Sequence, residues 1–264
     1  MKRLFAAIGI CTTLILLTGC PRNAEARKGV RLMTYNVGAF GKELEDSAPM
    51  IAAMIAELGA ETVGLNELDS CNRRHGVDQA LHLAGCLGSP WRGVFGRAMA
   101  YAGGSYGNGI VSRRKIVRHF SIPLPKGEGS EPRVCVVIET RRYVFAVCHL
   151  DHIGKEARLE QARVLTAELE RRYGGSRKPV FLAGDFNDTP DSPVIRQLSH
   201  GWTLLSPLGD TYSAKDPPTC IDYFFLLHNR ASVRVTGGDI CTSFASGDVE
   251  VASDHLPVYI DVEF

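Results

Sequence analysis

The amino-acid sequence predicts an α/β or α+β sandwich with β-sheets inside and helices outside. Short apolar runs typical of buried strands outnumber segments with helical periodicity, and the helical segments lie between pairs of such runs. The chain has 264 residues, of which 45% are hydrophobic and 22% charged. This composition is typical of one large folded domain and excludes a disordered chain or a multi-span membrane protein.

We predict that residues 1–19 are a lipoprotein signal peptide and not part of the fold. A basic start precedes an uncharged apolar run from Leu4 to Leu17, which is shorter than the roughly 20 residues that span a bilayer. The run ends in Leu17-Thr18-Gly19-Cys20, which resembles a bacterial lipobox, so that cleavage would precede Cys20 and lipid would be attached to it. An ordinary secretory signal or a retained short anchor is the alternative.

Residues 20–29 are then the lipidated cysteine and a polar tether, and residues 30–264 form the domain. We therefore expect an exported bacterial lipoprotein, anchored to a membrane through Cys20, in the periplasm or at the cell surface. No repeat, linker or low-complexity block divides residues 30–264, so we predict one domain. We also expect a monomer.

The charge balance argues against a strongly basic nucleic-acid-binding protein. The chain has 30 Lys and Arg against 29 Asp and Glu, a net charge of +1. Cleavage before Cys20 removes Lys2 and Arg3, which leaves 28 basic and 29 acidic residues and a net charge of −1. Tight binding to a nucleic-acid duplex is disfavoured, although a local basic patch could override the total.

Of the eight cysteines, Cys11 is removed with the predicted signal peptide and Cys20 would carry lipid, so six remain. These six suggest disulfides, because the chain is expected to be exported and their number is even. They are Cys71, Cys86, Cys135, Cys148, Cys220 and Cys241. Proximity in the sequence favours the pairs 71–86, 135–148 and 220–241 among fifteen possible pairings. Buried free thiols are the alternative, and zinc is disfavoured because no Cys-x-x-Cys spacing occurs.

The first half of the domain predicts two strands around a helix. Val30 to Asn36 alternates like a strand. A helix follows, capped at Asp46 or Ser47 and with Pro49 in its first turn. Apolar residues at helical spacing define its buried face, and Gly59 ends it; they are Met50, Ile51, Met54, Ile55 and Leu58. Thr62 to Leu65 is a short buried strand that ends at Asn66 and Glu67.

The second half predicts a hairpin, a long helix and three further strands. Arg133 to Ile138 and Tyr143 to His149 flank the turn at residues 140–142, which places Cys135 opposite Cys148. Glu156 to Tyr173 has one apolar helical face and ends at Gly174-Gly175. The three strands are Val180–Ala183, Ile221–Leu227 and Val258–Val262. Cys241 follows another extended stretch.

Polar residues with ligand or acid–base chemistry stand at the ends of these apolar strands. They are Asn36, Glu67, His149, Asp185, Asn187, Asp222, Asp254 and His255. A single strand-end Asp or Asn is usually a cap or turn former. Eight of them together predict that strand ends meet at one shared crevice.

Seven motifs occur in a fixed order between residues 31 and 260. They are Thr34-Tyr35-Asn36-Val37, Leu65-Asn66-Glu67, Gly107-Asn108-Gly109-Ile110-Val111-Ser112, His149-Leu150-Asp151-His152, Gly184-Asp185-Phe186-Asn187-Asp188-Thr189-Pro190, Ile221-Asp222-Tyr223 and Ser253-Asp254-His255-Leu256-Pro257-Val258. This series resembles the endonuclease/exonuclease/phosphatase superfamily, which has the DNase I-like fold. The resemblance implies a four-layered sandwich, in which two packed mixed β-sheets are flanked by helices.

Glu67 is the best candidate for a metal ligand. Hard oxygen ligands select Mg²⁺, Mn²⁺ or Ca²⁺, and Mg²⁺ sites often use one or two carboxylates with water and substrate phosphate. The resemblance also implies a metal on Glu67 with Asn36 beside it, and Asp254 could complete the site or hold a second ion. We expect Mg²⁺ or Mn²⁺, as one or two ions.

The resemblance implies that Asp185 and Asn187 orient water and contact a phosphate oxygen. Asp222 and His255 would form a carboxylate–imidazole pair, in which the carboxylate fixes the tautomer and raises the basicity of the ring. The sequence leaves open whether His255 or Asp185 takes the proton. His149 would bind a phosphoryl oxygen or protonate the leaving group, although by itself it could be a structural histidine.

Five further residues are assigned supporting parts. Arg133 could clamp phosphate through its guanidinium, with a solvated hairpin arginine as the alternative. Asn108 lies in a Gly-rich turn and could support Asn36 or contact the phosphate. Asp151 and His152 lie just past the strand that ends at His149, and with Arg158 they are expected to support the site from behind.

The predicted activity is divalent-metal-dependent hydrolysis of phosphate esters by attack of water on phosphorus, with phosphodiesters as the first choice. A phosphatase of lipid or sugar phosphates is the alternative among enzymes. Nucleic acid, lipid phosphate and sugar phosphate are all candidate substrates, and the membrane is the expected partner of the N-terminal lipid. A lipoprotein that binds a ligand without catalysis is the alternative of another class, but it predicts loss of a core residue, and none is missing.

Overall fold

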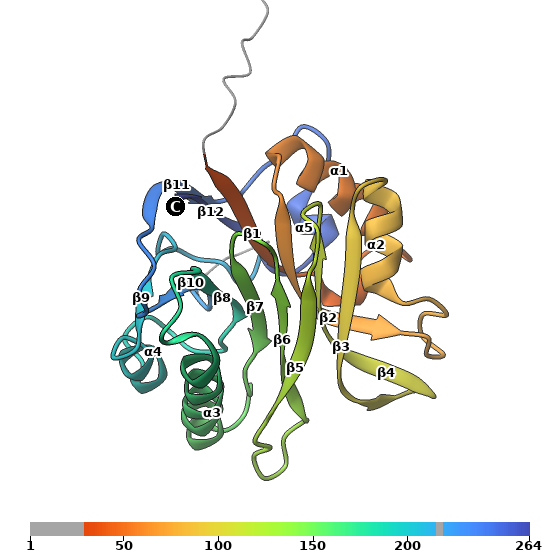
Figure 1. Cartoon of the computed structure of the whole chain (residues 1–264). Helices are drawn as coiled ribbons and strands as arrows, with labels where there is room; N and C mark the ends of the chain where they lie inside the picture. The colour runs from red at the N-terminus through yellow and green to blue at the C-terminus, as the bar shows by residue number, and fades with distance from the viewer. Residues whose placement is uncertain (1–28, 215–218) are drawn as a thin grey trace, which may run out of the picture.

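Two six-stranded β-sheets pack face to face between two layers of helices (Figure 1). The computed structural model describes residues 29–214 and 219–264. The predicted signal peptide, Cys20 and all of the tether except Gly29 lie outside the described residues. Within the described ranges, no helix combines the length and apolar character needed to cross a bilayer.

Each sheet is mixed, with one parallel pair among antiparallel neighbours. The first sheet has the spatial order β11 (Arg234–Ile240), β12 (Val258–Glu263), β1 (Val30–Asn36), β2 (Thr62–Ser70), β4 (Gly104–Ser112) and β3 (Arg92–Tyr101). The second has the order β5 (Arg118–Leu124), β6 (Arg133–Glu139), β7 (Val144–His149), β8 (Val180–Asp185), β10 (Asp222–Leu227) and β9 (Trp202–Leu204). The parallel pairs are β1 with β2 and β7 with β8.

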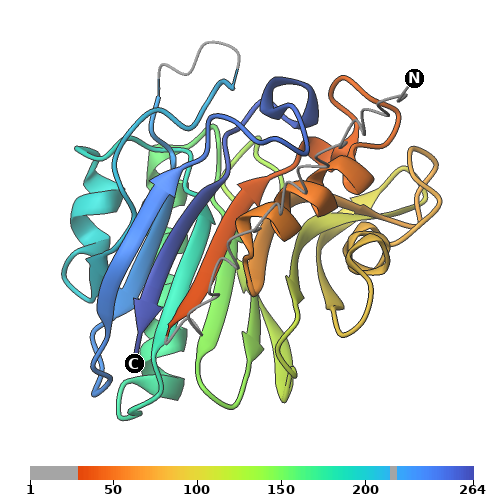
Figure 2. The ribbon, with the colours of Figure 1, turned by 90° about the horizontal axis from the view of Figure 1, so that it is seen from above.

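The helices complete a sandwich of four layers, as the resemblance implies. On the first sheet lie α1 (Ala48–Leu58), α2 (Gln79–Leu87), α5 (Val249–Ala252) and the short 3-10 helix η1 (Gly38–Phe40), and on the second lie α3 (Lys155–Tyr173) and α4 (Pro193–Leu198). Figure 2 shows the longer helices at the periphery of the strands. Every described strand finds its partners within residues 30–263.

Three apolar clusters hold the layers together. The central cluster lies between the sheets and contains side chains such as Leu32, Phe145 and Phe224, all fully buried. The outer clusters join α1 and α2 to the first sheet and α3 and α4 to the second. Burial of this kind stabilises by about 25 cal/mol per Å² of apolar surface removed from water.

Strand direction brings the polar residues to one end of the molecule. Asn36 pairs with Asn66 in the parallel pair of β1 and β2, and His149 pairs with Asp185 at the ends of β7 and β8. The antiparallel strand β10 begins at the same end, with Asp222 opposite Asp185. The expectation that these strand ends meet is therefore confirmed.

Most predicted elements agree with the structure, and one differs in a way that matters for the site. The first helix, the hairpin, the long helix and the strands near Val180, Ile221 and Val258 lie at their predicted places. The predicted strand Thr62–Leu65 instead continues to Ser70. Glu67 therefore does not end a strand but lies inside β2, where the register with β4 shifts between Leu65 and Leu68.

The prediction of three disulfides is not borne out, because all six cysteines of the domain are free thiols. Cys135 and Cys148 are register partners, as predicted, but both are buried as apolar residues beneath α3. Cys220 packs on the second sheet, whereas Cys241 follows β11 of the first sheet.

The predicted bridge between Cys71 and Cys86 fails for a geometric reason. Helix α2 begins beside Cys71, because Asp78 forms a β-bridge with Ser70. Eight residues of helix then carry Cys86 roughly 12 Å away. A disulfide needs Cα atoms within about 7 Å.

Candidate active site

A pocket of about 410 Å³ opens at the end of the molecule where the polar strand residues meet. Eight residues predicted from the sequence line it: Glu67, Arg133, His149, His152, Asp185, Asn187, Asp254 and His255. The other lining residues are Lys42, Tyr106, Glu131, Tyr212 and Ile221. Asn36 and Asp222 are buried and contact this set from behind.

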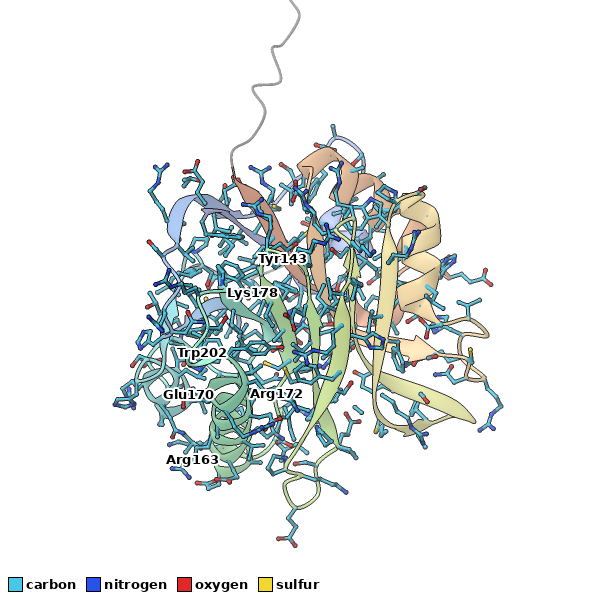
Figure 3. All side chains as sticks on the ribbon, in the orientation of Figure 1. Tyr143, Arg163, Glu170, Arg172, Lys178 and Trp202 are labelled. Atoms are coloured by element: carbon cyan, nitrogen blue, oxygen red, sulfur yellow. The ribbon has the colours of Figure 1, made fainter. Side chains whose placement is uncertain are left out.

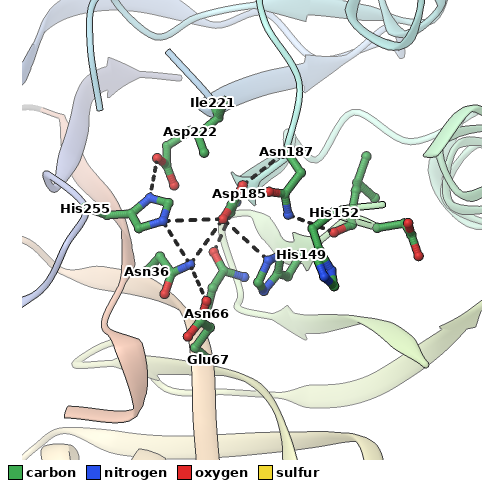
Figure 4. A network of polar contacts seen from close by, with 12 residues as sticks. Asn36, Asn66, Glu67, His149, His152, Asp185, Asn187, Ile221, Asp222 and His255 are labelled. Atoms are coloured by element: carbon green, nitrogen blue, oxygen red, sulfur yellow. Dashed lines mark hydrogen bonds and ion pairs between the residues drawn. The ribbon is translucent and has the colours of Figure 1, made fainter. Parts of the chain in front are cut away.

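Asn36 at the end of β1 connects both sheets (Figure 4). Its Nδ2 donates to Glu67 Oε1 and to Asp185 Oδ2, both at 3.1 Å, and lies 3.3 Å from His255 Nε2. Its Oδ1 accepts from the backbone N–H of Gly38 at 3.2 Å. The amide oxygen is thus turned away from Glu67, so in this structure Asn36 orients the carboxylate through its nitrogen.

Glu67 and Asn187 both hold left-handed backbone conformations. Their φ angles are 59° and 51°, a region that costs a residue with a side chain about 1–3 kcal/mol. The bulge in β2 gives Glu67 this conformation and directs its half-buried carboxylate into the pocket. Asn187 is fixed by a bond from its N–H to Asp185 Oδ1 at 2.9 Å. Strain at two residues of one pocket is typical of functional sites.

Asp222 and His255 form the carboxylate–imidazole pair that the sequence predicts. His255 Nδ1 lies 2.9 Å from Asp222 Oδ2, and both side chains are buried. Burial lowers the pKa of His255, but the charge and hydrogen bond of Asp222 outweigh burial and raise this pKa to about 9. The ring of Tyr212 packs against the imidazole, with centroids 4.8 Å apart.

Asp185 lies between His149 and His255. Its Oδ2 is 3.4 Å from His149 Nε2 and 3.7 Å from His255 Nε2. Burial raises the pKa of Asp185 to about 7, against the opposing effect of His255. A carboxyl group with a pKa in this range can exchange protons near neutral pH.

His149 differs from His255 in charge. It is buried, and its Nδ1 has no hydrogen-bond partner among the described side chains and backbone. Burial, followed by the positive charge of Arg133, holds the pKa of His149 well below its usual value. At neutral pH the ring of His149 is therefore neutral, whereas that of His255 is charged.

Arg133 is buried, so the alternative of a solvated hairpin arginine is wrong. Its residue exposure is only 5%, its Nη2 lies 2.9 Å from His152 Nδ1, and the nearest carboxylate, on Glu131, is 3.7 Å away. Its Nε has no partner within the described part of the chain. A buried guanidinium without a close carboxylate is costly, and an anion in the pocket would satisfy it.

Asn108 does not line the pocket, so its predicted support of Asn36 or of the phosphate would be indirect and stays a prediction. Its amide is used inside the protein: Nδ2 donates to Val134 O at 2.8 Å, and Oδ1 accepts from Asn66 Nδ2 at 3.1 Å. Asn66 in turn donates to Cys148 O and accepts from the Asp185 N–H. Asn108 therefore braces the strands that carry the site.

Asp151 and Arg158 do not line the pocket but brace the loops beside it, and their predicted support of the site stays a prediction. Asp151 Oδ1 accepts the N–H groups of Ile153 and Gly154, and Arg158 joins Asp151 O to Asp188 Oδ2. His152 is closer to the pocket than predicted, because it lines the wall beside Arg133.

Lys42 is a residue of the site that sequence reasoning missed. Its Nζ lies 2.8 Å from Asp254 Oδ2. Burial lowers the pKa of Lys42, but Asp254 and then Glu67 raise it, with a net upward shift. The pocket therefore attracts a cation between these carboxylates. A Cβ at Gly38 would lie 2.3 Å from the Lys42 side chain, so the glycine makes room for it.

A second place could also hold a metal ion. Ligand atoms of Asp185, Asp222 and His255 lie within 4.8 Å of one another. An ion there would compete with the His255–Asp222 hydrogen bond. Glu67 is free of this conflict, since its only hydrogen bond within the described residues is from Asn36.

The four-layered fold and the acid, amide and imidazole groups at one end of both sheets define a hydrolase of the DNase I-like class. The Endonuclease/Exonuclease/phosphatase family model matches residues 33–255, and the chain belongs to this family. A search of curated proteins gave no match.

Solved structures share the fold at low sequence identity. A mannosyl-6-phosphatase, Bt3783, of Bacteroides thetaiotaomicron is 21% identical with a TM-score of 0.72, over 89% of this chain and 100% of that chain. The human Nocturnin catalytic domain, with a bound sulfate anion, is 21% identical with a TM-score of 0.66. The match covers 89% of this chain and 93% of that chain. TDP2 of D. rerio, in complex with single-strand DNA product, is 17% identical with a TM-score of 0.68. The match covers 89% of this chain and 99% of that chain.

Proposed function

We propose that this protein is a divalent-metal-dependent hydrolase of small phosphate esters. The observation that carries the proposal is the buried guanidinium of Arg133, which shares one pocket with the carboxylates of Glu67 and Asp185. Phosphoryl transfer needs charge neutralisation at the phosphoryl oxygens and an oriented water, and these groups suit those two tasks.

Glu67 is the residue assigned to hold Mg²⁺ or Mn²⁺, with Asn36 fixing its orientation and Asp254 nearby. The donor set fits, because hard divalent ions accept one or two carboxylates together with water and substrate oxygens. The place of Lys42 beside Asp254 supports a cation-attracting position. When bound, the ion would supply positive charge to the phosphoryl oxygens.

Asp185 is assigned to orient the attacking water and accept its proton. The geometry supports this choice, because the carboxylate faces the pocket and the Nε2 atoms of both His149 and His255 point toward it. His255, held by Asp222, would contact the phosphoryl group as a charged donor. His149 would hydrogen-bond a phosphoryl oxygen, and Asn187 lies beside it in the wall.

A small substrate suits the pocket better than a nucleic acid does. The wall mixes cations, namely Lys42 and Arg133, with the carboxylates of Glu67, Glu131 and Asp254, so it offers no basic track for a strand. This observation favours a lipid or sugar phosphate over a nucleic acid, whereas the sequence analysis placed phosphodiesters first. The mannosyl-6-phosphatase with a similar fold is consistent with this choice.

The non-catalytic alternative is disfavoured by the buried charges of the site. A ligand-binding protein has no need of a buried Asp222–His255 pair or of a strained Glu67. We further propose that the protein is exported and anchored by lipid on Cys20, on the basis of the apolar segment and lipobox-like residues that precede the domain.

A substrate panel tests the proposed activity. The chain beginning at residue 21 is incubated with a sugar phosphate, a phosphodiester, and single-strand and duplex DNA, each with Mg²⁺, Mn²⁺ or chelator. We expect hydrolysis of the monoester, loss of activity in chelator, and loss in Glu67→Gln but not in the exposed control Glu160→Gln. Activity that persists in chelator would refute metal dependence, and faster cleavage of DNA would refute the substrate class.

A further inference from the structure

The end of the molecule opposite the pocket carries a positively charged surface. Strand β1 runs from Val30 to Asn36, so its first residue lies roughly 20 Å from the pocket end. The loop at residues 113–117 and the hairpin turn at residues 140–143 lie at this far end, since Ser112 pairs with Thr62 at the start of β2 and Glu139 pairs with Val144. Tyr143, the last residue of this turn, is labelled in Figure 3.

Six cations form what we call the basic end: Arg92, Arg113, Arg114, Lys115, Arg141 and Arg142. Two neighbouring grooves are lined by them and share Lys115. The first groove has a volume of about 240 Å³, and all four of its charged lining residues are cationic. The whole chain carries a net charge of only +1, so this surface concentrates positive charge that the total conceals.

The acidic residues at this end neutralise only one cation of the basic end, because the others are paired with cations outside it. Glu61 is bound by Arg114, whereas Glu139 is bound by Arg118 and Lys178. Asp261 is bound by Arg31, and Glu263 by Arg234. In contrast, no ion pair or side-chain hydrogen bond to Arg113, Lys115 or Arg141 is found within the described ranges, and Arg113 and Lys115 are exposed. These three charges are therefore available to an external anion.

We propose that the basic end binds an anionic phospholipid surface. The described chain enters the fold at this same end, because Gly29 and Val30 lie beside Val262 and Glu263. The lipid anchor proposed on Cys20 would thus hold this end near a bilayer. Val117, in the same loop, is 57% exposed and adds an apolar contact, and basic residues beside a bilayer attract anionic lipids.

A nucleic acid is the weaker choice of partner for this surface. A strand bound at the basic end would keep its phosphates roughly 20 Å from Glu67 and Asp185, too far to be cleaved. On a membrane, by contrast, this orientation turns the pocket toward water. The inference rests on the proposed function at this point, and it narrows the substrate to a water-soluble sugar phosphate and excludes a headgroup of the same bilayer.

Vesicle binding tests the inference without reference to catalysis. The unlipidated chain beginning at residue 21 is sedimented with vesicles of phosphatidylcholine alone and of phosphatidylcholine mixed with phosphatidylglycerol. We expect binding only to the mixed vesicles, and weaker binding as salt is added. The variant Arg113→Gln/Lys115→Gln/Arg141→Gln should bind more weakly, by about fivefold for each neutralised residue.

A matched variant removes three exposed cations elsewhere, Arg73→Gln/Lys126→Gln/Arg163→Gln, and should bind like the parent chain. An equal loss of vesicle binding in both variants, or no preference of the parent chain for the anionic vesicles, would overturn the inference. Tighter binding of the basic end to DNA than to vesicles would also overturn it. The first variant should keep its hydrolytic activity on a soluble substrate, so that failure of the proposed activity is distinguishable from failure of membrane binding.

Discussion

His255 Nδ1 lies 2.9 Å from Asp222 Oδ2, while the Nε2 atom of the same ring faces Asp185 at 3.7 Å. The imidazole is thus held between two buried carboxylates, but only Asp222 is close enough for a hydrogen bond. Asp222 therefore fixes the proton on Nδ1 and stabilises the charged ring. Asp185 faces the pocket instead. Asp222 is therefore assigned to hold His255, and Asp185 to act on the substrate side.

Removal of the Asp222 charge should lower the pKa of His255. In the metal-free protein we expect Asp222→Asn to move this pKa down from about 9, as an NMR titration of the imidazole would measure, and to reduce kcat by roughly 10²-fold or more. The pair also stabilises the fold in a pH-dependent manner. Because the pKa of His255 is higher in the folded than in the unfolded chain, its contribution to the free energy of unfolding is complete below the unfolded pKa of about 6.5. This contribution is lost as pH rises through the folded pKa of about 9. The exposed control Asp239→Asn should change neither quantity, and an unchanged His255 titration in Asp222→Asn would contradict the assignment.

Arg133 should act in binding the anion. We expect Arg133→Met to raise KM and to weaken inhibition by inorganic phosphate by about 10- to 100-fold, because a hydrogen bond to a charged group contributes about 1.5–3 kcal/mol. Arg163→Met, on the outer face of α3, serves as the control. Phosphate inhibition that is unchanged in Arg133→Met would show that the buried guanidinium is only structural.

Lys42 should compete with a divalent cation. Its ammonium lies on Asp254 and near Glu67, so Lys42→Met should tighten Mn²⁺ binding by about fivefold, the effect of roughly 1 kcal/mol from one charge at close range. Isothermal titration calorimetry with Mn²⁺ measures this, and Glu67→Gln should weaken binding under the same conditions. Weaker Mn²⁺ binding in Lys42→Met would mean that the lysine supports the metal instead.

Glu139 should contribute to stability in a pH-dependent manner at the far end of the fold. Burial raises the pKa of its carboxyl, but Lys178 and Arg118 lower it further, so the net shift is downward. The stabilisation is present above the unfolded pKa of about 4.3 and is lost as pH falls through the lower folded value. Glu139→Gln should therefore reduce the free energy of unfolding by about 1 kcal/mol at pH 7 and flatten its decline below pH 4.3, as urea titrations at several pH values would measure.

The part of the fold that the sequence predicts is its interior. Strands such as β7 and β8 are buried along their length and stand out as apolar runs. The edge strands β3, β5 and β9 were not predicted, because half-exposed residues interrupt their patterns. Strand β4 was also missed, because it is rich in glycine; a Cβ at Gly107 would lie 2.0 Å from Gly96 O.

Some residues of the candidate site could be predicted from the sequence, and others could not. Residues at the ends of parallel strands, such as Asn36, His149 and Asp185, could be predicted because strand direction gathers them. Lys42 could not, because it lies in an irregular loop and reaches the pocket through tertiary packing over Gly38. The burial of Arg133 was equally invisible, since it depends on His152 and the neighbouring loop rather than on its own strand.

Gly64 in β2 should be intolerant of a side chain, because it sets the distance between the two sheets. A Cβ there would lie 2.9 Å from Val147 Cγ2 and 3.1 Å from Phe145 Cε1 on β7, so Gly64→Ala should lower the free energy of unfolding by about 1–3 kcal/mol through overpacking. Gly85→Ala in α2 is the matched control, since a Cβ there has no neighbour within 4 Å and alanine should raise helix stability by about 0.5–1 kcal/mol. Urea unfolding of the two variants measures both effects. Equal stability of Gly64→Ala and the parent chain would mean that the sheets can separate at this point, and the contacts that join Asn36 to Asp185 would then be less rigid than the packing implies.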